Sequence, residues 1–299
     1  MMNFRYHLVS LIAVFTALAI GVILGAGPLQ TSISTALSSP GGATADAQTL
    51  AQTQKNAQAE AAGVTALAGK SLPGTLNGVN VVTVSLPGAT PSDVDQVRKD
   101  LTTAGASVVG RVSLTNNWDG AALANYRQTL ATSLQSRLPN APASNVTPEG
   151  IIGYSIVTVL TTTGSQSDVI RDILTSDSNP ILSLEEDPKG TAQAIVLIGA
   201  RGSEVGGQSG AHASGAQSPE AWTGTAQAVA TAPKGGVVIG DASTDSAFVS
   251  HIRALGVPVT TVDSVGTAYS SAAAVLALPT AGPQARPLGV GKGAQSVLP

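Results

Sequence analysis

The sequence contains no cysteine among its 299 residues, and its two methionines are Met1 and Met2. The absence of cysteine excludes disulfide bonds and thiolate metal sites. Cu(I) prefers thiolate and thioether ligands, and beyond the first two residues the chain offers neither. Stability must therefore come from packing.

Aromatic and charged residues are also scarce, at 3% and 11% of the chain, and the formal net charge is −3. Nucleic-acid binding usually needs a basic surface or aromatic side chains on which bases stack. We therefore expect no nucleic-acid partner. With 43% hydrophobic residues, the chain has enough apolar side chains for a core of Val, Leu, Ile and Ala.

Motifs of nucleophilic and phosphate-binding enzymes are missing as well. Residues 207–210 (GQSG) lack the final glycine of a nucleophile elbow. Residues 289–292 (GVGK) are similar to part of a phosphate-binding loop, but Arg286 and Gly293 stand where the motif needs Gly and Ser or Thr. We expect no enzymatic activity.

The histidines of the chain are His7, His212 and His251. His212 and His251 are weak candidates for a metal site of two imidazoles. Histidines so placed are more often ordinary surface residues, and we predict no resident cofactor.

A hydrophobic run does exist at residues 8–26, LVSLIAVFTALAIGVILGA, and it carries no charge. As a helix it covers roughly the 30 Å hydrocarbon core of a bilayer. A cleaved signal peptide fits less well, because the candidate cuts leave Leu24 at a small-residue position or Pro28 at the new N-terminus. We predict that residues 1–29 form a cytoplasmic lead and a single transmembrane anchor.

The orientation of this anchor follows from the basic residues near it. Arg5 precedes the run, and the next basic residue after it is Lys55. The positive-inside rule then predicts a cytoplasmic N-terminus and an extracytoplasmic C-terminal domain in the cell membrane.

Small residues recur every four positions along the predicted anchor, at Ala13, Ala17, Gly21 and Gly25. Such a stripe lets two helices approach closely, as in small-xxx-small pairing. The alternative is that Gly and Ala are simply common in membrane helices. The stripe favours a homodimer or a membrane partner protein.

Residues 30–78 are predicted to form a partly helical stalk. The segment 43–70 is rich in Ala and Gln, and Leu50, Ala57 and Val64 lie seven apart, as in a heptad of a coiled coil. The companion heptad position is mostly polar, which favours a solvated helix over a stable coiled coil.

An α/β domain is predicted at residues 79–279. The strand 79–86, the helix 91–105 and the strand 106–114 form a βαβ unit, which predicts a parallel pair with a right-handed crossover. Further on, strands at 192–200, 236–240 and 257–262 alternate with helices at 218–231, 244–255 and 267–278. This order predicts a mainly parallel, Rossmann-like sheet with helices on both faces.

The remaining segments are less regular. Helices are expected at 118–138, 148–160 and 168–174, an acidic loop at 177–189, and a loop at 201–217. Residues 280–299, rich in Pro and Gly, are expected to be a disordered tail.

Two carboxylates are candidate ligand-binding residues, because Asp241 and Asp263 each follow a predicted strand. Ligands of open parallel sheets bind at the carboxyl ends of the strands. The alternative is that each aspartate stabilises the turn before the next helix.

In three blocks, residues 4–29, 86–114 and 256–278, the sequence resembles the actinobacterial MctB family of copper transport proteins. Residues 4–29, FRYHLVSLIAVFTALAIGVILGAGPL, resemble the start of the family. Residues 86–114 resemble its first βαβ unit, and residues 256–278 resemble its last strand and helix. The resemblance implies copper efflux or copper homeostasis through the envelope.

The same family includes the septal protein SteB, which implies a second role. It is that of a non-catalytic scaffold that acts with a membrane partner to control peptidoglycan hydrolases in cell separation. An unrecognised ligand-binding domain or hydrolase is a third possibility. We expect a membrane-anchored, non-enzymatic envelope protein whose copper role does not rest on direct Cu(I) ligation.

Overall fold

A computed structural model of the chain describes residues 43–139, 146–202 and 217–299. The chain divides into two compact units, residues 1–60 and 61–299. None of the helices within the described ranges is long and apolar enough to cross a membrane. The predicted anchor and its stripe at positions 13, 17, 21 and 25 lie outside these residues, so they stay predictions.

The helix predicted over residues 43–70 is confirmed as α3 (Ala43–Ser71), and its role as a stalk stays a prediction. Its side chains from 48 to 67 are exposed or partly exposed, as expected for a solvated helix. In the unit 61–299, Ala68, Leu72 and Leu76 are buried and join the core of the α/β domain. The helix therefore ends by packing onto the domain, just before the turn at Gly74, which has a positive φ of 84°.

A sheet of seven strands, in the order β3-β2-β1-β4-β5-β6-β7, forms the centre of the domain. All neighbouring strands are parallel except β3, which runs antiparallel to β2. The strands are β1 (Asn80–Ser85), β2 (Ser107–Leu114), β3 (Leu182–Glu186), β4 (Ala194–Ile198), β5 (Gly236–Ile239), β6 (Thr260–Val262) and β7 (Arg286–Leu288). The chain builds outward from β1 to β3 and then returns to add β4 on the other side of β1. The strand order therefore reverses between β1 and β4.

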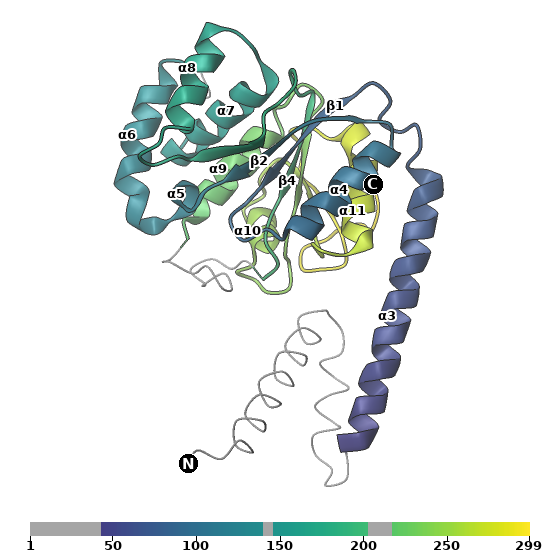
Figure 1. The fold of residues 1–299 in the computed structure, drawn as a ribbon. Helices are drawn as coiled ribbons and strands as arrows, with labels where there is room; N and C mark the ends of the chain where they lie inside the picture. Colours follow the sequence, from purple (N-terminus) through teal and green to yellow (C-terminus); the bar gives the residue numbers. More distant parts are fainter. Residues whose placement is uncertain (1–42, 140–145, 203–216) are drawn as a thin grey trace, which may run out of the picture. The chain divides into compact units, whose positions relative to one another are not determined.

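Helices cover both faces of the sheet, as predicted (Figure 1). One face carries α4 (Pro91–Thr103) and α11 (Ala268–Ala277). The other carries α5 (Asn116–Asp119), α6 (Ala124–Gln135), α7 (Pro148–Thr161), α8 (Ser165–Leu174), α9 (Pro219–Val229) and α10 (Phe248–Ala254). Two short 3₁₀ helices, η1 (Ala121–Leu123) and η2 (Leu278–Thr280), complete the described elements.

The continuous apolar run of β4 reflects burial on both faces. Ile195 and Leu197 join the core beneath α5–α10, whereas Val196 and Ile198 join the core beneath α4 and α11. Successive side chains of a strand point to opposite faces, so a strand covered on both sides needs apolar residues throughout.

The segment 177–189 is not only an acidic loop, because it contains the edge strand β3. Its glutamates bind arginines of the neighbouring elements: Glu185 pairs with Arg111 of β2, and Glu186 with Arg98 of α4 at 2.7 Å. Charged side chains are common on edge strands, where they discourage pairing with another sheet. The charges that suggested a loop are thus part of a sheet edge.

The prediction that residues 280–299 form a disordered tail is also wrong for the central part of this segment. Arg286–Leu288 forms β7 at the opposite edge of the sheet, parallel to β6, and Leu288 is buried. Pro287 lacks a backbone N–H, which an edge strand tolerates. Proline content alone does not exclude such a strand when specific side chains hold the segment in place.

Candidate functional site at the carboxyl edge of the sheet

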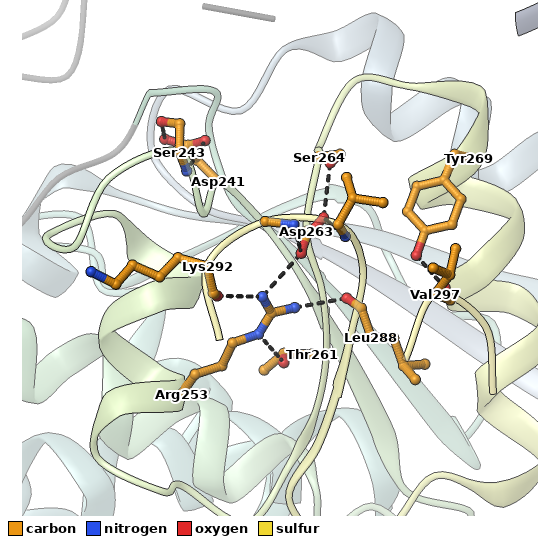
Figure 2. Close-up of polar contacts among 12 residues, drawn as sticks. Asp241, Ser243, Arg253, Thr261, Asp263, Ser264, Tyr269, Leu288, Lys292 and Val297 are labelled. Atoms are coloured by element: carbon orange, nitrogen blue, oxygen red, sulfur yellow. Dashed lines mark hydrogen bonds and ion pairs between the residues drawn. The ribbon is translucent and has the colours of Figure 1, made fainter. Parts of the chain in front are cut away.

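Asp241 follows β5 and Asp263 follows β6, so the structure places both predicted carboxylates at the same edge of the sheet (Figure 2). Each has its own partners. Asp241 accepts hydrogen bonds from the backbone N–H and the hydroxyl of Ser243, at 3.1 and 2.8 Å. This is the turn-stabilising role given above as the alternative.

Asp263 is fully buried and accepts hydrogen bonds at both carboxylate oxygens. Arg253 Nη1 donates to Oδ2 at 3.0 Å, and the Ser264 hydroxyl donates to Oδ1 at 2.8 Å. The backbone N–H groups of Val290 and Gly291 donate to Oδ1 and Oδ2 at 3.1 and 2.9 Å. Such charge-assisted bonds satisfy a buried carboxylate almost completely.

Arg253 of α10 carries the opposing charge and is also buried, with 5% of its side chain exposed. Besides Asp263, its guanidinium donates to Thr261 Oγ1 at 3.0 Å and to the carbonyls of Leu288 and Lys292 at 2.7 and 2.8 Å (Figure 2). Burial lowers the pKa of Arg253, and the Asp263 carboxylate opposes that shift. The pair therefore joins α10, β6 and the C-terminal segment.

The glycines of the segment 289–292 allow this arrangement. A Cβ atom at Gly289, whose φ is 145°, would collide with the Asp263 carboxylate, and one at Gly291 would lie 3.1 Å from its Oδ2. The segment resembles a phosphate loop because both use successive backbone N–H groups to hold an anion. Here the anion is a carboxylate of the same chain.

The histidine candidates are not brought together within the described residues, because His212 lies outside them. His251 belongs to α10, and its ring meets Trp222 edge-on with the ring centroids 6.4 Å apart. In the described ranges, no group of three or more His, Cys, Asp or Glu residues is placed to hold a metal ion.

Sequence reasoning missed a buried polar cluster formed by residues of α5, α6, α7 and α9. Asp119 accepts a hydrogen bond from Trp222 Nε1 at 3.2 Å. Burial raises the pKa of Asp119 to about 6, and the Trp222 bond and the Arg127 charge only partly oppose this. Arg127, which is 1% exposed, donates to the Gly120 carbonyl at 2.6 Å and faces Glu149 at 3.5 Å. No local sequence pattern links these residues, because they meet only through packing of the helices.

A mainly parallel sheet with a reversal of strand order beside its first strand, covered by helices on both faces, defines the Rossmann-like class of α/β proteins. The chain belongs to the MctB family, whose model, described as copper transport outer membrane protein, matches residues 1–299. No curated protein matches the sequence significantly. At the level of the family, this is a copper-related protein of the cell envelope.

Proposed function

We propose that this chain is a non-enzymatic, membrane-anchored envelope protein that acts in copper homeostasis through a partner protein. Membership of the MctB family supports the copper role. The donor set argues against tight Cu(I) binding by the chain itself, because Cys is absent and Met occurs only at positions 1 and 2.

The observation that carries the non-enzymatic part of the proposal is the state of Asp263. A general acid or base must exchange a proton with a substrate at hydrogen-bond distance. Asp263 is fully buried, and Arg253, Ser264 and two backbone N–H groups already donate to it. The carboxylate best placed for chemistry at this edge therefore acts as a structural anion.

Anchor and stalk complete the proposed arrangement. The apolar run at 8–26, with Arg5 before it, holds the chain in the cell membrane with its α/β domain outside the cytoplasm. The chain forms a homodimer, or a complex with a membrane partner protein, through the anchor and α3. The side chains of α3 from 48 to 67 are exposed or partly exposed and so can take part in such contacts.

A septal scaffold of the SteB type is the second candidate. The helix α3 has 29 residues, and its side chains from 48 to 67 are exposed or partly exposed, so it offers a surface on which a partner protein can bind. This surface favours the scaffold. The two candidates differ in phenotype. Deleting the gene raises cellular copper or copper sensitivity with normal division under the first proposal, and gives chained cells with normal copper under the second.

Direct copper binding is tested on the purified full-length protein in detergent. In an anaerobic competition with a Cu(I) chelator, we expect no tight binding, and the variant with both His212→Ala and His251→Ala should behave like the unaltered protein. Stoichiometric, tight Cu(I) binding that this double variant abolishes would overturn the proposal that copper is handled through a partner.

A further inference from the structure

A pocket of about 240 Å³ opens at the carboxyl edge of the sheet, and the buried Asp263 is not among the residues that line it. Its walls are the first two turns of α4 and the first turn of α11, and its lining includes Ile198 and Ile239 at the ends of β4 and β5. The pocket lies beside the reversal of strand order, since α4 follows β1 directly and β4 is the strand next to β1. Ligands of open α/β sheets bind at this point.

An ion pair across the strand reversal forms one wall. Arg201, in the loop after β4, donates from Nε to Asp93 Oδ2 at 2.9 Å and from Nη2 to Asp93 Oδ1 at 2.6 Å. Asp93 is buried, whereas 56% of the Arg201 side chain is exposed. This bidentate geometry holds the guanidinium plane in one orientation at the mouth of the pocket.

Side chains with hydroxyl or amide groups make up most of the polar lining, and several already donate a hydrogen bond within the protein. Gln96 Nε2 and the Ser271 hydroxyl donate to the two carboxylate oxygens of Asp100, at 3.0 and 2.5 Å. The Ser270 hydroxyl donates to the Thr267 carbonyl at 3.0 Å. The oxygens of Gln96, Ser270 and Ser271 therefore remain as acceptors for a ligand that donates hydrogen bonds.

The charges around the pocket nearly cancel. Arg201 contributes one positive charge, while Asp93 and Asp100 contribute two negative charges. The N-termini of α4 and α11 each add roughly half a positive charge, which brings the sum close to zero. The pocket therefore gives a ligand with a net charge little electrostatic binding energy. An anion would also have to compete with Asp93 for Arg201.

The size of the pocket restricts the ligand further. Drug-sized ligands occupy pockets of roughly 300–1,000 Å³, and this pocket is smaller.

We propose that this pocket binds a small, neutral, polyhydroxylated molecule of about one sugar ring. Its hydroxyl groups donate to Gln96, Ser270 and Ser271 and accept from Arg201, while its C–H face lies against the apolar lining of Ile198 and Ile239. This binding function is separate from the copper role and needs no metal.

Binding is tested by saturation-transfer NMR and calorimetry on the purified full-length protein with five probes. Glucose, N-acetylglucosamine and myo-inositol represent neutral polyols, acetate represents anions and glycine represents zwitterions. We expect saturable binding of at least one polyol with a Kd on the order of millimolar, as suits so few ligand atoms. Failure of all three polyols to bind, or tighter binding of acetate or glycine, would overturn the proposal.

The location is tested with Ser92→Phe, which places a large side chain at an exposed position of the pocket wall, and with Thr102→Phe, a matched control at an exposed position in the last turn of the same helix. Ser92→Phe should weaken polyol binding at least tenfold and Thr102→Phe less than twofold. In the unaltered protein, the polyol should slow hydrogen exchange in residues 92–97 and 265–271. Equal binding by both variants, or exchange that slows only elsewhere, would show that the pocket is not the site.

Discussion

The buried pair of Asp263 and Arg253 makes the sharpest prediction about this fold. Substituting Asp263→Ala removes the only carboxylate that contacts the guanidinium among the described residues, and it also removes the acceptor of the Val290 and Gly291 N–H groups. Arg253 is left 5% exposed without its counter-ion. Breaking one partner of a buried ion pair costs about 3–5 kcal/mol, because the remaining charge stays desolvated.

We expect the lower end of this range. Arg253 keeps three neutral acceptors, Thr261 Oγ1 and the carbonyls of Leu288 and Lys292. The segment 286–292 can also detach, so that water reaches the guanidinium. The loss in the free energy of unfolding is then limited to the free energy needed to separate β7 from β6. A loss of about 3 kcal/mol is large against a total stability of about 5–15 kcal/mol.

Two measurements check this prediction. Denaturant unfolding should show a lower free energy of unfolding for Asp263→Ala, and hydrogen exchange should become faster at the β6–β7 pairing and at residues 289–291. Formate, which can replace the missing carboxylate, should restore part of the loss. Asp241→Ala is the control at the same edge, because it removes only bonds within its own turn, and it should cost less than about 1 kcal/mol.

The prediction rests on Asp263 holding the C-terminal segment in place. If Asp263→Ala unfolded with the same free energy as the unaltered protein and exchange at residues 286–291 stayed slow, the segment would be held by β6 pairing alone. The buried pair would then have no structural role.

Three further predictions concern other parts of the chain. The pKa of Asp119 is raised from 3.8 to about 6, so the native state binds a proton that the unfolded state has released, and stability falls as pH rises from about 4 to about 6. The full loss in the free energy of unfolding is about 3 kcal/mol, at 1.36 kcal/mol per pKa unit. Asp119→Asn should remove this pH dependence when denaturant unfolding at pH 4.5 is compared with unfolding at pH 7.5. An unchanged difference between the two pH values would contradict the assignment of the raised pKa to Asp119. Gly289→Ala should destabilise the protein by about 1–3 kcal/mol because of its positive φ and the carboxylate beneath it, whereas Gly282→Ala, with open space around it, should be nearly neutral in the same assay. Substituting Gly21→Ile together with Gly25→Ile should reduce crosslinking of the chain to itself or to its partner in membranes, and equal crosslinking would mean that the small-residue stripe has no pairing role.

Local sequence patterns determined most of the domain. The apolar run at 192–200, which contains β4, predicted a strand buried on both faces, and the β-branched run at 79–86, which contains β1, predicted a strand. The alternation of such strands with helices predicted the parallel sheet. Such patterns are readable because period and burial are properties of a few consecutive residues. Length and hydrophobicity alone also predict the anchor at 8–26, which lies outside the described residues and stays a prediction.

Only the tertiary structure decided the edges of the sheet and the role of Asp263. The sequence placed this aspartate after a strand, but its backbone donors lie 27 and 28 residues further along the chain. The strand β7 has three residues, one of them proline, and no local pattern predicts it. It forms because Arg253 binds its Leu288 carbonyl and Asp263 binds the N–H groups that follow, and contacts between segments so far apart in sequence arise only when the chain has folded.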